Sequence, residues 1–122
     1  MTQGKVIELQ ARINVVLRLS NLPDVVLEFV LDTGFEGALT LPPNAVAVLG
    51  LPFVQEMSAN LADDSSIKTN IHAATIIWNG AEIDVAVLAM GKRPLLGTAL
   101  LANKRLGVDF EENGTVTIGD IS

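Results

Sequence analysis

Three adjacent residues, Asp32, Thr33 and Gly34, are the best candidates for a reaction centre in this chain. They directly follow the apolar run Phe29–Leu31, so the strand that this run predicts carries the carboxylate inward rather than out to water. A buried carboxylate at a strand end has a pKa that its surroundings can move, as acid–base catalysis requires. Gly34 lets the backbone turn where a Cβ would clash. An ordinary strand followed by an Asx-type turn is the alternative interpretation, because Asp and Gly are common turn residues.

Other kinds of reaction centre have less support in the sequence. His72 is the single histidine and there is no cysteine, so neither a Ser–His–Asp arrangement nor a His/Cys metal site is indicated. We interpret His72 as a strand residue and Trp78 as a packing residue. Asp63 and Asp64 could suggest a cation site, but adjacent acids beside serines are typical of a solvated turn. No cofactor and no metal are expected.

Composition sets the class of protein. The 122 residues predict a single domain spanning 1–122 with a real core. No apolar run reaches the roughly 18 residues that a membrane span needs, and the N-terminus lacks an apolar signal core. The net charge is −6, from 8 basic and 14 acidic residues, with no Lys/Arg cluster. We therefore expect a cytoplasmic protein that binds neither nucleic acid nor membrane.

Short apolar runs separated by turn residues indicate a mainly β chain, folded as an antiparallel barrel or sandwich. Asn79-Gly80 is the strongest hairpin signal, because a type I′ turn needs positive φ at both central residues. Asn113-Gly114 predicts a second such turn. About eight or nine strands are expected, over residues 5–12, 13–19, 25–31, 37–41, 55–62, 67–78, 81–90, 108–110 and 115–118.

Helical signals are few. Thr98 can cap a short C-terminal helix over Ala99–Arg105, whose leucines would face the core. A weaker candidate begins at Pro43-Asn44 and ends at Gly50. The polar stretch Asp63–Ser66 predicts the tip of a hairpin that projects toward solvent.

Three landmarks then occur in order: Leu31-Asp32-Thr33-Gly34-Phe35, the polar-tipped hairpin about thirty residues later, and Leu95-Leu96-Gly97 before a leucine-rich segment and closing strands. Taken together, this set resembles the retropepsin-type (clan AA) aspartic proteases, which include the retroviral proteases, and especially the prokaryotic branch with a D-T-G-F signature. The likeness covers residues from about Lys5 to Ile118. It implies a closed antiparallel β barrel with one short C-terminal helix, and a homodimer that cleaves a peptide or protein substrate.

The resemblance also implies roles for individual residues. Asp32 would be catalytic, Thr33 would hydrogen-bond across the dimer, and Gly34 would bring the backbone close to the substrate. The residues expected at the substrate are Phe35 and Glu36 in the cleft, Ala62, Asp63, Asp64, Ser65 and Ser66 in a flap, and Leu96 and Gly97 in the apolar loop behind the catalytic loop.

Two departures from the family pattern leave a second hypothesis open. Retroviral enzymes carry an arginine where this chain has Thr98, so the salt bridge that braces their active-site loop is missing or is made by another residue. The flap tip contains no glycine, and its two acids would disfavour acidic peptides. The first hypothesis is a homodimeric aspartic endopeptidase with a mildly acidic to neutral optimum. The alternative is a peptide-binding or regulatory module that keeps the fold with little or no turnover.

Overall fold

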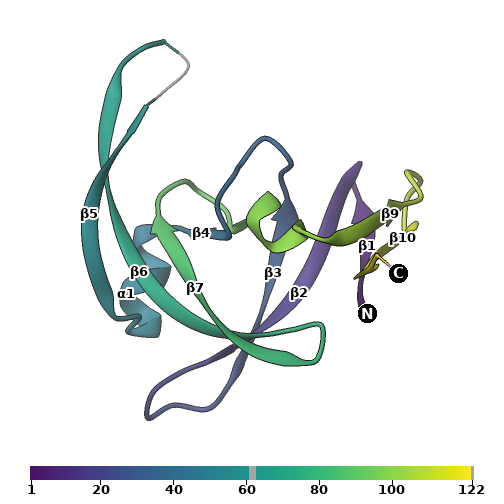
Figure 1. The fold of residues 1–122 in the computed structure, drawn as a ribbon, viewed down its shortest axis with the longest axis horizontal. Helices are drawn as coiled ribbons and strands as arrows, with labels where there is room; N and C mark the ends of the chain where they lie inside the picture. The colour runs from purple at the N-terminus through teal and green to yellow at the C-terminus, as the bar shows by residue number, and fades with distance from the viewer. Residues whose placement is uncertain (61–62, 122) are drawn as a thin grey trace.

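The structure is a computed structural model that describes residues 1–60 and 63–121. Strands dominate it, joined by one α-helix and one 3-10 turn (Figure 1). In chain order the elements are β1 (Thr2–Ile7), β2 (Gln10–Arg18), β3 (Val25–Leu31), β4 (Leu39–Leu41), α1 (Pro43–Leu49), β5 (Phe53–Asn60), β6 (Ser66–Trp78), β7 (Ala81–Ala89), β8 (Leu95–Leu96), η1 (Thr98–Leu101), β9 (Lys104–Val108) and β10 (Thr115–Asp120). The prediction of a mainly β chain is confirmed.

All the strands belong to one ten-stranded sheet in the order β5-β6-β7-β4-β8-β3-β2-β1-β10-β9. Most neighbours are antiparallel, but β3 pairs with β8 and β4 with β7 in parallel. An additional pairing of β6 with β2 closes a ring of strands from β2 through β3, β8, β4 and β7 to β6. Strands β5 and β9 are the two free ends of the sheet, and β1 and β10 also lie outside the ring.

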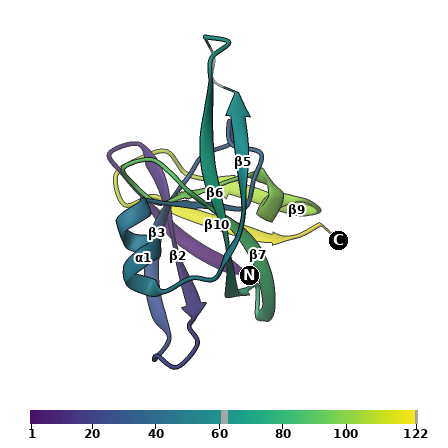
Figure 2. The same ribbon diagram turned by 90° about the vertical axis from the view of Figure 1, so that its left-hand side faces the viewer.

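The β5–β6 hairpin extends well beyond the rest of the ribbon in both views (Figures 1 and 2). The loop that follows β3 lies toward the same end of the molecule (Figure 1). Strand β6 has 13 residues, and its two halves pair with different strands. Its first half pairs with β5 in the projecting hairpin, and its second half pairs with β7 and β2 in the body of the sheet.

Of the two predicted helices, the weaker candidate forms and the stronger one does not. The weaker candidate is a true α-helix, α1, which has Pro43 in its first turn and ends at Gly50 in the left-handed conformation (φ 66°). The predicted helix Ala99–Arg105 is wrong, because a single 3-10 turn gives way at Asn103 (φ 63°) to β9. Pairing with β10 decides this segment, since Lys104–Val108 forms a continuous register with Val116–Asp120. In the part of the chain that the structure describes, no helix has the length and apolar character needed to cross a bilayer.

Of the two predicted type I′ turns one is right and one is wrong, and one predicted strand is interrupted by a turn that the sequence did not indicate. Asn79 and Gly80 both have positive φ (47° and 81°), as a type I′ hairpin requires. At the second predicted turn only Asn113 does (φ 65°), and Gly114 is required for space, since a Cβ there would lie 1.9 Å from the Asp109 carbonyl oxygen. The predicted strand over residues 5–12 is divided at Glu8 and Leu9 (φ 54° and 59°), where neither Gly nor Asn marks the turn.

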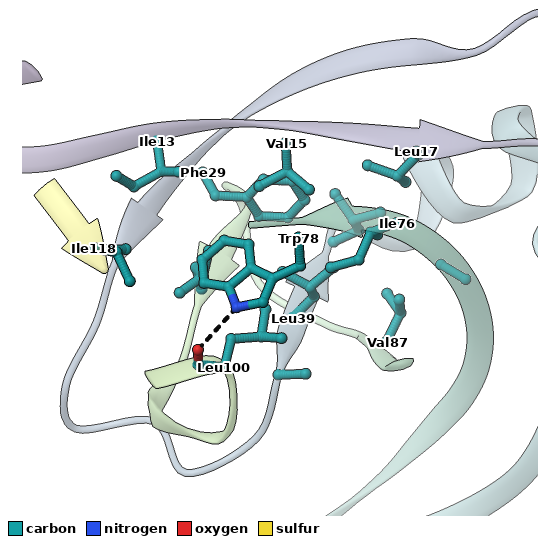
Figure 3. Close-up of a cluster of buried hydrophobic side chains, with 14 of the residues drawn as sticks. Ile13, Val15, Leu17, Phe29, Leu39, Ile76, Trp78, Val87, Leu100 and Ile118 are labelled. Carbon is teal, nitrogen blue, oxygen red and sulfur yellow. Dashed lines mark hydrogen bonds between the residues drawn. The ribbon is translucent and has the colours of Figure 1, made fainter. Parts of the chain in front are cut away.

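The core lies inside the ring and extends toward β1 and β10 (Figure 3). Its largest fully buried side chains come from six of the ten strands: Phe29, Ile13, Leu17, Leu39, Leu41, Ile76, Leu96 and Ile118. Trp78 is buried among them, as predicted, and its indole Nε1 donates to the Leu100 carbonyl oxygen at 3.1 Å (Figure 3). This bond ties the end of β6 to η1, the turn that directly follows the Leu96-Gly97 landmark.

Candidate active site

Asp32 is the first residue after β3, at the point where that strand runs beside β8. Its backbone N–H donates to the Leu96 carbonyl oxygen at 2.9 Å, which continues the parallel pairing of Leu31 with Leu96 by one residue. The Asp32 side chain is half-buried rather than sequestered. The sheet therefore fixes the backbone of this residue while its carboxylate still reaches a solvent-accessible space.

The loop after Asp32 is a compact turn built on that carboxylate. The Gly34 N–H donates to Asp32 Oδ1 at 2.9 Å, and the Phe35 N–H donates to the Asp32 carbonyl oxygen at 3.1 Å. This is the Asx-type turn of the plainer interpretation, and it also orients the carboxylate. The other carboxylate oxygen has no hydrogen-bond partner among the described residues. Gly34 does not have positive φ, and a Cβ there would make a tight 3.2 Å contact with Asp32 Oδ1, so the expected clash is milder than predicted.

A second segment, Leu96–Ala99, holds this loop from behind; we call it the bracing segment. The Gly97 N–H donates to the Ala38 carbonyl oxygen at 2.9 Å. The Thr98 N–H donates to the Phe35 carbonyl oxygen at 2.8 Å, and the Thr98 hydroxyl reaches the same oxygen at 3.3 Å. The Thr98 side chain thus hydrogen-bonds to the loop after Asp32, at the position where the resemblance implied a missing salt bridge.

Gly97 is required by close packing. A Cβ there would lie 2.2 Å from the Gly37 carbonyl oxygen and 2.5 Å from the Phe35 carbonyl oxygen. The Phe35 ring covers both glycines, since a Cβ at Gly37 would lie 2.5 Å from its Cζ. Leu96 is fully buried. Phe35, Leu96 and Gly97 therefore position the loop in this structure, and no part of the Leu96 side chain is exposed to a ligand.

Asp32 and Thr33 face a cavity of about 560 Å³ whose wall is otherwise largely apolar. Its lining comes from four separate parts of the chain: Leu9, Gln10, Ala11, Val30, Leu31, Asp32, Thr33, Arg93, Leu95, Leu106, Val108 and Phe110. Leu9 and Phe110 stand at its rim with 71% and 66% of their surfaces exposed. Sequence reasoning found only the Asp-Thr-Gly edge of this cavity, because the other residues are distant in sequence and carry no motif.

The hairpin tip is described from Asp63 onward, and the predicted flap residue Ala62 lies outside the described residues. The Asp63 carboxylate accepts hydrogen bonds from the Ser65 hydroxyl and from the Ser65 backbone N–H. Both bonds lower the pKa of this exposed carboxyl, and the bond from the hydroxyl has the larger effect. Asp64 has positive φ (65°), a conformation that Asp and Asn adopt more readily than most residues other than glycine. Ser66 begins β6 and is exposed. Neither Glu36 nor any described tip residue lines the cavity beside Asp32.

The other candidate groups have structural explanations. His72 Nδ1 lies 2.9 Å from the Leu51 carbonyl oxygen, and the ring packs edge-on against Phe53 with centroids 5.6 Å apart. The interpretation of His72 as a strand residue is therefore confirmed, since it lies within β6. Among the described residues, no three His, Cys, Asp or Glu side chains come together in a way that could hold a metal ion.

No protein-family model matches this chain, and no curated protein resembles it significantly. Its function must therefore be argued from the carboxylate, the loop that carries it and the cavity beside it.

Proposed function

We propose that this chain is an aspartic endopeptidase of the retropepsin type, acting as a homodimer. One observation carries the proposal: the Asp32 carboxylate is held by the Gly34 N–H on a braced loop at the edge of a largely apolar cavity. A cavity of this kind suits an extended peptide, whose apolar side chains would contact the walls while its backbone lies near the carboxylate. An ordinary Asx turn needs neither the brace nor the cavity.

The chemistry needs two carboxylates, and the cavity supplies one. Among its described lining residues, Asp32 is the single acid. A second copy related by a twofold axis would supply the same residue again. The free sheet edge at β9 favours this arrangement, since Leu106 and Val108 of that strand line the cavity beside Asp32. An unpaired strand edge of this kind can pair with the same edge of a second copy, next to the half-buried Leu106 and Val108.

In that dimer the two carboxylates would share one proton, because like charges about 3 Å apart cannot both ionise. The ionised Asp32 would remove a proton from a water held between the pair. The protonated Asp32 would donate its proton to the peptide carbonyl oxygen as water adds to the carbon. Breakdown of the tetrahedral intermediate would then release amine and acid, with no covalent link to the protein. The Gly34 N–H would hold each carboxylate in place throughout.

The alternative, a peptide-binding module with little turnover, keeps one supporting observation. The described part of the hairpin tip is held in its own Asp63–Ser65 turn and does not line the cavity, so a closed flap is not part of this structure. The second argument for a binding module was the missing arginine. That argument is weaker here, because the Thr98 hydroxyl at the same position hydrogen-bonds to the Phe35 carbonyl oxygen of the loop.

Cleavage of a diverse peptide mixture, read by mass spectrometry between about pH 4 and 7, distinguishes the two. Asp32→Asn should abolish every cut without unfolding the protein, because the amide oxygen can still accept from the Gly34 N–H. Asp24→Asn is the matched control, since exposed Asp24 makes only a 3.8 Å ion pair with Arg18. Cuts that persist in Asp32→Asn would refute the proposal. A folded dimer that binds peptides without cutting them would favour the binding module.

A further inference from the structure

We propose that Arg93 makes the cavity beside Asp32 selective for peptides that place an acidic side chain, Asp or Glu, next to the apolar residues bound there. This inference names the substrate class of the site and rests on the proposed function. It depends on where Arg93 lies, how it is held and which charges surround it.

Arg93 is the only basic side chain among the described residues that line the cavity. It belongs to the loop between β7 and β8, two residues before Leu95, which lines the same wall. Arg93 is itself exposed, so its charge acts from the edge of a largely apolar wall and is partly screened by solvent. A bound side chain would therefore be selected by its charge as well as by its apolar surface.

Arg93 is positioned by a hydrogen bond to Gln10, another residue that lines the cavity. Its Nη1 donates to the Gln10 Oε1 atom at 3.1 Å. The same amide oxygen accepts from Arg12 Nη2 at 3.1 Å, and Arg12 in turn bonds Glu28 at 3.1 Å. Gln10 is thus held by Arg12, which is itself paired with Glu28 of β3. Gln10 in turn holds the Nη1 group of Arg93. A guanidinium has five donor N–H bonds, so most of those on Arg93 remain available for a carboxylate.

The charge balance favours an acidic guest. Arg12 already has a carboxylate partner in Glu28, whereas no described carboxylate lies within ion-pair distance of Arg93. Asp32 is the only acid among the described residues of the cavity wall, and it is not bonded to Arg93. The acidic residues of the hairpin tip, which led the sequence analysis to expect a bias against acidic peptides, lie outside this wall. Arginine also binds carboxylates in a two-bond geometry, which adds directionality to the attraction.

The test uses binding so that it does not depend on turnover. In the full-length Asp32→Asn protein, fluorescence anisotropy would compare labelled apolar peptides that differ only in one Glu, Gln or Lys. We expect the Glu peptide to bind on the order of tenfold more tightly than the Gln peptide. Adding Arg93→Gln should remove that preference, and adding Arg93→Glu should move it to the Lys peptide. Lys92→Glu changes the charge of the neighbouring exposed residue outside the cavity wall, and it should leave the preference in place.

Several results would overturn the inference. They are equal binding of the Glu and Gln peptides, no binding of any peptide, and a Glu preference that survives Arg93→Glu or is lost equally in Lys92→Glu. A change in sedimentation with no change in peptide preference would place Arg93 at a contact between copies and would also overturn it. Failure of the proposed function looks different: the wild-type protein would not cleave peptides, whatever the Arg93 variants bind.

Discussion

Replacing Gly97 with alanine tests the bracing segment most severely. The new Cβ would lie 2.2 Å from the Gly37 carbonyl oxygen and 2.5 Å from the Phe35 carbonyl oxygen, below the 3.0 Å that real Cβ contacts essentially never cross. Both atoms belong to backbone, so relief requires the loop after Asp32 to move by nearly an ångström. Such a forced shift costs about 1–3 kcal/mol.

The same movement weakens the bonds that hold the loop. The Gly97 N–H to Ala38 and Thr98 N–H to Phe35 bonds are the nearest, and each contributes about 0.5–1.5 kcal/mol net. Together these terms predict that the free energy of unfolding falls by about 2–6 kcal/mol, a large share of the roughly 5–15 kcal/mol of a typical domain.

Urea unfolding followed by circular dichroism measures this loss. Gly119→Ala is the matched control, because its Cβ would meet only the flexible Met1 side chain, at 3.4 Å, and its φ is ordinary. That variant should unfold within about 1 kcal/mol of wild type. If Gly97→Ala unfolds at the same urea concentration as Gly119→Ala, the reasoning about the brace is refuted.

Two smaller predictions concern the elements around the site. Trp78→Phe leaves the buried Leu100 carbonyl without its indole donor, and it should lower stability by about 1–3 kcal/mol; a melting temperature equal to that of wild type would contradict this. The pKa of the Asp120 carboxyl is lowered mainly by a hydrogen bond from Lys104 and, to a smaller extent, by the positive charge of Lys104. Lys104→Gln should therefore raise that pKa toward 3.8. A lowered folded-state pKa contributes stability above 3.8 that is lost as pH falls through the folded value, so the variant should lose less stability on acidification than wild type. NMR titration of Asp120 checks the pKa directly, and an unchanged value would rule out this role for Lys104.

Local patterns in the sequence were enough to find the strand that carries the candidate site. The apolar run from Val25 to Leu31 forms β3, which ends directly before Asp32 as predicted, because a short apolar run bounded by turn residues is a local signal. The Asn79-Gly80 turn was also predicted correctly, because its conformation depends on these two residues themselves. The hairpin around Asp63 followed from a polar tip between two strands.

Features that depend on distant partners were missed. The predicted helix Ala99–Arg105 followed from Thr98 and the leucines after it, and only pairing with β10 makes Lys104–Val108 a strand. The Glu8-Leu9 turn carries no glycine or asparagine and is set by the register between β1 and β2. The cavity gathers Leu9, Arg93 and Phe110 from three loops, so no single stretch of sequence indicates it.

The central claim is that one active site takes Asp32 from each of two copies. It is tested most directly by mixing wild-type protein with Asp32→Asn in varied proportion at fixed total concentration, after exchange of subunits, and measuring peptide cleavage. If both carboxylates are needed, activity follows the square of the wild-type fraction, so an equal mixture retains about one quarter of the wild-type rate. An equal mixture that retains about one half would show that each copy works alone, and it would contradict the account.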